Sequence, residues 1–205
     1  MSLFLIRHGE TALNAARVMQ PSDTPLSAQG LRQADALARR LAPLGLAGIL
    51  SSDLPRAWQT AQAVAAATGL PIVTSALLHE RNFGDLRGRP YDTLGFDPLA
   101  MDAAPPGGES AADFAHRVAQ AFAAAVAWRA GMTGPLAVVT HGLVIRSLLA
   151  AHTVLPAPMA LPAAMANASL TIVGAHAPHE VTLLDCTAHL DTARLRPDAK
   201  GLSGG

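Results

Sequence analysis

Residues 2–11, Ser-Leu-Phe-Leu-Ile-Arg-His-Gly-Glu-Thr, contain the stretch that decides the fold. Residues 3–6 form a continuous apolar run, which is typical of a strand covered on both faces. Arg7 and His8 follow directly, and Gly9 ends the strand. A cationic pair is therefore expected at the carboxyl end of a buried strand, where open α/β sheets bind their ligands.

Strand-like and helix-like segments alternate along the rest of the chain. Strands are expected over 47–50, 71–74, 136–139, 168–173 and 181–184, with the last two as a candidate hairpin, and helices are expected over 27–41, 54–68, 110–128 and 143–152. Ser27, Asp53 and Ser110 are expected to cap helices, whereas residues 76–109 look irregular, with one helical turn near Tyr91. The pattern predicts an α/β fold, a three-layer α-β-α sandwich with a mainly parallel central sheet.

The composition of the chain indicates how many domains it forms and which classes of partner it is not expected to bind. Half of the 205 residues are hydrophobic and no linker divides them, so we expect a single domain over residues 1–186. Residues 187–205 lose the apolar periodicity and are predicted to form a flexible tail. Zero net charge gives no electrostatic footprint for nucleic acid, and no apolar run is long enough to span a membrane.

The cellular compartment and the capacity to bind a metal can be judged from three features: the single cysteine, the late histidines and the first residues of the chain. The single cysteine, Cys186, excludes an internal disulfide and fits a reducing compartment. Because the first strand begins at once, there is no room for a signal peptide, and we predict a cytoplasmic protein. The late residues His176, His179 and His189 are irregularly spaced and lack a Cys-x-x-Cys pair, so no metal site is predicted there.

A second histidine repeats the pattern of the first. His141 stands between Thr140 and Gly142, directly after the strand expected at 136–139. Arg56 lies in the first turn of the helix that follows the strand at 47–50. If these strands are neighbours in one parallel sheet, two histidines and two arginines converge at its carboxyl edge, where helix N-termini add N–H donors. Paired guanidinium groups match a phosphate best.

Six segments in order carry a resemblance to a known family. They are residues 5–11 with Asn14 and Arg17, 23–27 with Gly30 and 33–34, 51–57 with 60–61, 80–84, 106–110 and 139–142. Together they resemble the histidine phosphatase superfamily, the phosphoglycerate-mutase-like proteins, and within it the broad-specificity phosphatase branch. The resemblance spans about residues 2–150 and implies the phosphoglycerate-mutase-like fold.

The resemblance implies a role for each site residue. His8 would be the nucleophile that becomes a phosphohistidine, with Arg7, Arg56 and His141 binding the phosphoryl group. Glu80 would be the general acid and then the base, although Glu10, Asp85 and Glu109 are competing carboxylates. The expected substrate-binding residues are Asn14, Arg17, Gly142, Arg81 and Arg87. Arginines and histidines would replace a metal, so neither metal nor cofactor is expected.

The same resemblance leaves the reaction open between two outcomes. The short span from Arg89 to Gly107 favours a phosphomonoesterase acting on a small phosphorylated metabolite, whereas the Glu-Arg-x-Phe-Gly-x-Leu-x-Gly spelling leans toward a cofactor-dependent phosphoglycerate mutase. A catalytically silent member that binds phosphorylated ligands is a further alternative. Residues 81–109 are the expected selectivity wall, where Arg81, Arg87 and Arg89 hint at a second anionic group on the substrate. The chain could be a monomer or a homodimer.

Overall fold

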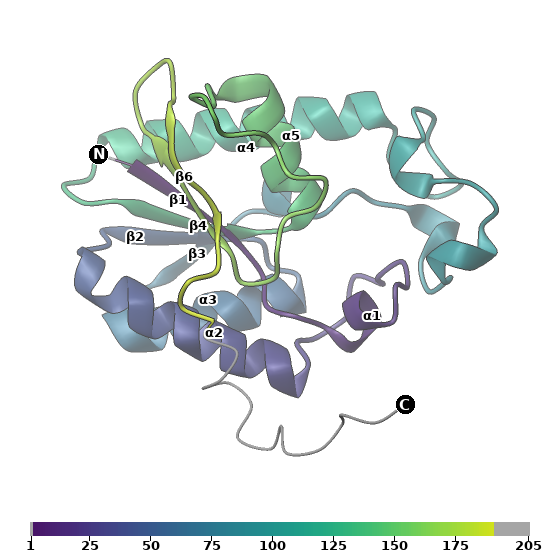
Figure 1. Ribbon diagram of the computed structural model, residues 1–205, viewed down its shortest axis with the longest axis horizontal. Coiled ribbons are helices and arrows are strands. Elements are labelled where there is room, and N and C mark those ends of the chain that lie inside the picture. The colour runs from purple at the N-terminus through teal and green to yellow at the C-terminus, as the bar shows by residue number, and fades with distance from the viewer. Residues whose placement is uncertain (1, 191–205) are drawn as a thin grey trace.

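A computed structural model describes residues 2–190, which form one six-stranded sheet with helices on both faces (Figure 1). The strand order is β3-β2-β4-β1-β5-β6. Neighbours from β3 to β1 pair in parallel, whereas β5 pairs antiparallel with both β1 and β6. The strands are β1 (Ser2–Arg7), β2 (Gly48–Ser51), β3 (Ile72–Thr74), β4 (Leu136–Thr140), β5 (Leu170–Gly174) and β6 (Val181–Cys186). The mainly parallel sheet and the closing hairpin are both confirmed.

The side chains of β1 alternate between the two faces of the sheet. Leu3 and Leu5 pack in the apolar cluster below α4 and α5, and Phe4 and Ile6 pack in the cluster below α2 and α3. Because successive residues of a strand point to opposite faces, one apolar run serves both layers of the core. The helices are α1 (Ala12–Ala15), α2 (Ala28–Leu41), α3 (Pro55–Thr68), α4 (Ala111–Ala130) and α5 (Gly142–His152). The predicted three-layer sandwich is confirmed.

Two of the three expected helix caps are present. The hydroxyl of Ser27 accepts a hydrogen bond from the N–H of Gly30, and Ser110 accepts one from Asp113, both at 3.0 Å. The prediction for Asp53 is wrong. Helix α3 begins one residue later, after Leu54, and the carboxylate of Asp53 instead accepts a hydrogen bond from His79.

The long irregular segment is built from short 3-10 turns, including the expected one at Tyr91. In this segment the turns are η2 (Ala76–Leu78), η3 (Gly84–Leu86), η4 (Tyr91–Thr93) and η5 (Pro98–Ala100), whereas η1 (Ala42–Leu44) follows α2. In Figure 1 the teal segment that contains η3 to η5 lies beside α1. Backbone bonds join the two, from Met19 N–H to the Arg89 carbonyl and from Tyr91 N–H to the Arg17 carbonyl, each 2.9 Å long. The segment therefore forms a wall at the carboxyl edge of the sheet.

The boundary predicted between the domain and the tail, after residue 186, lies too early in the chain. His189 bonds through Nε2 to the carbonyl of Ala168 at 2.9 Å, and Arg40 donates to its Nδ1 at 3.0 Å. Residues 187–190 are thus packed against the domain, while 191–205 lie outside the described residues. Over the described part of the chain, no helix has both the length and the apolar character needed to cross a membrane.

Candidate active site

The parallel pairing of β1 with β4 brings the two predicted histidines together. Arg7 and Thr140 are partners in the register, so that His8 and His141 follow at the same edge of the sheet. Their ring centroids are 5.1 Å apart with the planes at 60°. Only 2% of the surface of His8 is exposed, and His141 is fully buried. The two imidazoles therefore lie close together, and His8 lines a cavity at this edge of the sheet.

The hydrogen bond of His8 fixes which ring nitrogen carries the proton. Its Nδ1 lies 2.7 Å from the carbonyl oxygen of Gly9. A carbonyl oxygen can only accept, so Nδ1 is the protonated atom and Nε2 carries the free lone pair. Burial, and then the charges of Arg7 and Arg56, lower the pKa of His8 well below its ordinary value. The side chain is therefore a neutral imidazole with a nucleophilic Nε2.

The hydrogen bond of His141 favours the ring proton on Nδ1 and the lone pair on Nε2. Its Nε2 lies 2.9 Å from the hydroxyl oxygen of Ser52, and this hydroxyl accepts the N–H of Leu54 at 3.3 Å. The hydroxyl hydrogen can then be donated to Nε2, which leaves the proton of the neutral ring on Nδ1. Burial and the charges of Arg56 and His8 lower the pKa of His141 well below its usual value. Its Nδ1 is buried without a protein partner and can serve as a neutral donor to a ligand.

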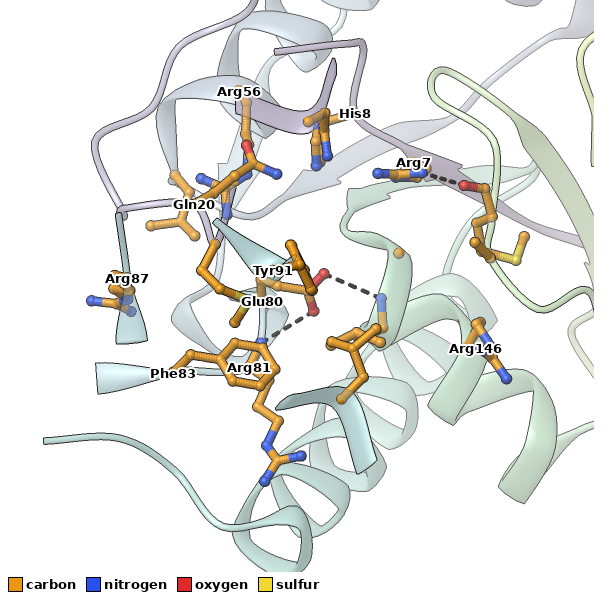
Figure 2. A pocket seen from close by; sticks show the side chains of 18 of the residues that line it. Arg7, His8, Gln20, Arg56, Glu80, Arg81, Phe83, Arg87, Tyr91 and Arg146 are labelled. Carbon is orange, nitrogen blue, oxygen red and sulfur yellow. Dashed lines mark hydrogen bonds between the residues drawn. The ribbon is translucent and has the colours of Figure 1, made fainter. Parts of the chain in front are cut away.

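Arg7 and Arg56 supply the positive charge of the site (Figure 2). Arg7 donates through one terminal nitrogen to the carbonyl of Met165, and Arg56 donates to the carbonyl of Pro21 at 3.3 Å. The Nε atoms of both arginines are buried without a partner. Burial lowers the pKa of Arg56 to about 10, which keeps the group charged at neutral pH. Two cations with unused donors make this edge of the sheet a site for an anion.

Glu80 faces these cations from the wall formed after β3. Its two carboxylate oxygens accept the N–H groups of Leu143 and Arg81, each at 3.1 Å (Figure 2). Burial nevertheless raises the pKa of Glu80 above its ordinary value, although the hydrogen bonds and the arginines oppose the shift. A carboxyl group with a raised pKa can hold a proton and give it up near neutral pH.

The competing carboxylates lie elsewhere. Glu10 accepts the hydroxyl of Ser27 at 2.9 Å at the start of α2, and Glu109 forms an ion pair with Arg117 at 2.7 Å. Neither lines the cavity, and neither does Asp85. Within the described residues that line the cavity, Glu80 is the single carboxylate, which favours it as the proton donor.

Four of the five predicted substrate-binding residues line the cavity, and in three of them, Asn14, Gly142 and Arg87, the position leaves room or donors for a ligand. The amide oxygen of Asn14 accepts from Thr11 and from Asn167 at 3.3 Å, so its NH₂ can face the ligand. A Cβ on Gly142 would lie 3.4 Å from the Nε of Arg7, so the glycine leaves room beside that guanidinium. Arg87 lines the cavity near Arg56.

Arg81 also lines the cavity, but much of its guanidinium is engaged by the protein, and its role in substrate binding stays a prediction. Its guanidinium donates to the carbonyls of Met101 at 2.6 Å and Glu109 at 3.3 Å, and it lies 5.2 Å from the ring centre of Phe83. Figure 2 shows this group pointing away from Glu80. Backbone carbonyls of the irregular segment thus accept from two of its guanidinium nitrogens, while the N–H of Arg81 donates to Glu80.

Arg17 lies outside the central cavity. Its side chain is exposed, with Cζ 6.0 Å from the ring centre of Tyr91, and it lines a neighbouring hollow instead. Its role as a substrate-binding residue stays a prediction, now located in this neighbouring hollow.

Several lining residues were missed by the sequence reasoning. Arg146 stands four residues after Gly142, one turn along α5, and donates to the carbonyl of Ala163. That spacing was the signal that could have found it. The other missed lining residues include Gln20, Ser22, Phe83, Tyr91 and Met165. Met165 carries no comparable signal, because it enters through a loop that only the tertiary structure places here.

The comparisons with known proteins agree with this geometry. The model of the histidine phosphatase superfamily (branch 1) matches residues 3–185. The chain belongs to this superfamily. It is an enzyme of the phosphatase type, with mutase activity also possible. A curated relative, the probable phosphoglycerate mutase GpmB of Yersinia pestis, is 38% identical over 183 residues, covering 84% of each chain.

Solved structures of the family have the same fold. YhfR of Bacillus stearothermophilus is 32% identical with a TM-score of 0.78, over 92% of this chain and 98% of that one. A mycobacterial glucosyl-3-phosphoglycerate phosphatase in complex with VO3 is 33% identical with a TM-score of 0.72, over 84% and 90%. A putative alpha-ribazole-5'-P phosphatase of Escherichia coli is 27% identical with a TM-score of 0.77, over 92% and 97%.

Proposed function

We propose that this histidine phosphatase is a metal-independent phosphomonoesterase that acts on a small phosphorylated metabolite through a phosphohistidine on His8. The observation that carries the proposal is the free lone pair on Nε2 of a neutral, buried His8 between two cationic arginines. A nucleophile held in this way needs no base to activate it.

The reaction proceeds by two displacements. Nε2 of His8 attacks phosphorus and the bond from phosphorus to the leaving oxygen breaks, while Glu80 gives its proton to that oxygen. Glu80, now ionised, removes a proton from a water molecule that attacks the phosphohistidine. The bond from phosphorus to nitrogen breaks, inorganic phosphate departs, and His8 and Glu80 return to their starting forms.

Charge in both transition states is carried by groups already in place. Arg7 and Arg56 bind the equatorial phosphoryl oxygens, and His141 and Asn14 add neutral donors. These four residues do the work that a metal ion does in other phosphatases, which supports a metal-independent reaction. Among residues 2–190 there is also no group of three His, Cys, Asp or Glu side chains that could hold a metal ion.

A mutase is the second candidate, favoured by the name of the curated relatives and by the residues that follow Glu80. The phosphatase is preferred because solved structures with the same fold are named as phosphatases. The two reactions share the phosphohistidine and differ in whether water or a second substrate removes the phosphoryl group.

An assay in EDTA tests the proposed function. The enzyme is expected to release inorganic phosphate from p-nitrophenyl phosphate in the presence of EDTA. It is also expected to convert little 3-phosphoglycerate to 2-phosphoglycerate, with or without 2,3-bisphosphoglycerate. Isomerisation faster than phosphate release would show a mutase. Loss of hydrolysis in EDTA with recovery on adding a divalent metal would contradict the metal-independent reaction, and no turnover of either kind would indicate a binding protein.

The two pKa shifts predict the pH dependence of kcat/KM for glycerol 2-phosphate, whose leaving alkoxide needs a proton. The first step needs neutral His8, whose pKa lies below its ordinary value of 6.5, and protonated Glu80, whose pKa lies above 4.5. Activity should therefore fall in acid as His8 gains a proton, well below pH 6.5, and fall at higher pH as Glu80 loses one. The Glu80→Gln enzyme should lack the alkaline limb that Glu80 causes. Ionisation of the substrate is common to both enzymes, so an unchanged alkaline limb would contradict the assignment.

A further inference from the structure

A second hollow opens from the catalytic cavity. The two share five lining residues, which makes them continuous: Asn14, Gln20, Tyr91, Leu99 and Ala164. We call the second hollow the side pocket. Its remaining lining residues are Arg17, Val18, Asp92, Phe96, Asp97 and Pro98.

The walls of the side pocket are held by hydrogen bonds. The bonds between residues 17–19 and 89–91 described above tie its two sides together, and Val18 and Pro90 form an antiparallel bridge. On the third side, the carboxylate of Asp97 accepts the N–H of Leu99 at 2.9 Å and so caps η5. The pocket is therefore formed before any ligand binds.

Apolar side chains are exposed inside this pocket. Phe96 is 49% exposed and Leu99 42%, and both are among the large apolar residues most open to solvent. Single exposed apolar residues are ordinary, but two in one hollow that leads to an active site indicate a contact surface. The ring of Tyr91 lines the same hollow, so two aromatic rings are available to a planar partner.

The position of Tyr91 indicates which part of a substrate reaches the side pocket. Figure 2 shows Tyr91 beside Glu80, and Tyr91 lines both hollows. The oxygen that leaves phosphorus must lie at Glu80 to receive its proton. A leaving group that extends from this oxygen past Tyr91 enters the side pocket.

The charges of the side pocket argue against a second acidic group there. Its cation, Arg17, lies over the ring of Tyr91, and two carboxylates, Asp92 and Asp97, line the same walls. A carboxylate or a second phosphate would face these aspartates. A neutral ring would not be repelled by these carboxylates.

We propose that the side pocket binds the leaving group of the substrate and that this leaving group carries a planar aromatic or heteroaromatic ring. The inference rests on the proposed phosphomonoesterase function and names its substrate class. Phe96 and Leu99 set the preference by packing against the ring.

Two phosphomonoesters test the inference in the intact chain. One, 4-methylumbelliferyl phosphate, has a planar ring in its leaving group, and the other, glycerol 2-phosphate, has none. For each enzyme we take kcat/KM for 4-methylumbelliferyl phosphate divided by kcat/KM for glycerol 2-phosphate. The two leaving groups differ in chemical reactivity, but this difference is the same for every variant and cancels when the ratios are compared. We expect Phe96→Ala and Leu99→Ala each to lower this ratio about five- to tenfold, because each removes apolar contact with the ring.

Two further variants serve as controls. Val73→Ala removes a side chain of similar exposure, 45%, from β3, where it lines neither hollow, and should keep the wild-type ratio. Phe96→Leu keeps an apolar contact without the ring and should fall between wild type and Phe96→Ala. Ratios unchanged in both alanine variants would overturn the inference and leave the proposed function standing. A wild-type enzyme that released phosphate from neither substrate would overturn both.

Discussion

Replacing His8 by alanine is expected to lower kcat for phosphate release by about 10⁴-fold or more, because no other group in the cavity can replace the nucleophile. The free lone pair of Nε2 depends on the Gly9 carbonyl holding the proton on Nδ1, and His141 lacks that partner. Steady-state hydrolysis of p-nitrophenyl phosphate measures the effect.

The matched control for this variant is His116→Ala. His116 is exposed on α4 and does not line the cavity, so this enzyme should keep wild-type activity. A His8→Ala enzyme that retained more than about a tenth of wild-type kcat would show that the imidazole is not the nucleophile.

Replacing Glu80 by glutamine is expected to lower kcat about 10²- to 10⁴-fold for glycerol 2-phosphate, whose leaving alkoxide needs a proton. The first step with p-nitrophenyl phosphate should be much less affected, because p-nitrophenolate leaves without one. The second step, hydrolysis of the phosphohistidine, would remain slow because the variant lacks the carboxylate that removes a proton from water. Rapid mixing should therefore show a burst of about one p-nitrophenol per enzyme, followed by slow turnover.

Asp85→Asn is the matched control for this variant, since Asp85 is an exposed carboxylate in the same irregular segment and lines no part of the cavity. It should behave as wild type with both substrates. Equal losses for the two substrates in Glu80→Gln, with no burst, would contradict the role of Glu80 as acid and base.

The sequence was sufficient for the parts of the fold that depend on local patterns. The apolar run before Arg7 predicted a strand covered on both faces, and the repeat of histidine and glycine after two strands predicted their meeting at one edge. These predictions succeeded because parallel strands end at the same edge of a sheet, so position in the chain fixes position in space.

Features that depend on competition between partners were beyond the sequence. Arg81 follows Glu80 directly, yet its long side chain turns to the carbonyls of Met101 and Glu109. Asp53 could have capped α3, but His79 provided another partner. The side pocket required residues 17–20 to meet residues 91–99, a pairing without periodic pattern.

The most direct test of the account is to find the phosphoryl group on the enzyme. Glu80→Gln enzyme is mixed with p-nitrophenyl phosphate, quenched in alkali, and mapped by mass spectrometry beside His8→Ala. The account predicts about one phosphoryl group per chain, on Nε2 of His8, stable in alkali, lost in acid, and absent from His8→Ala. Turnover by the wild-type enzyme without any such adduct in Glu80→Gln, or an adduct on another residue, would contradict it.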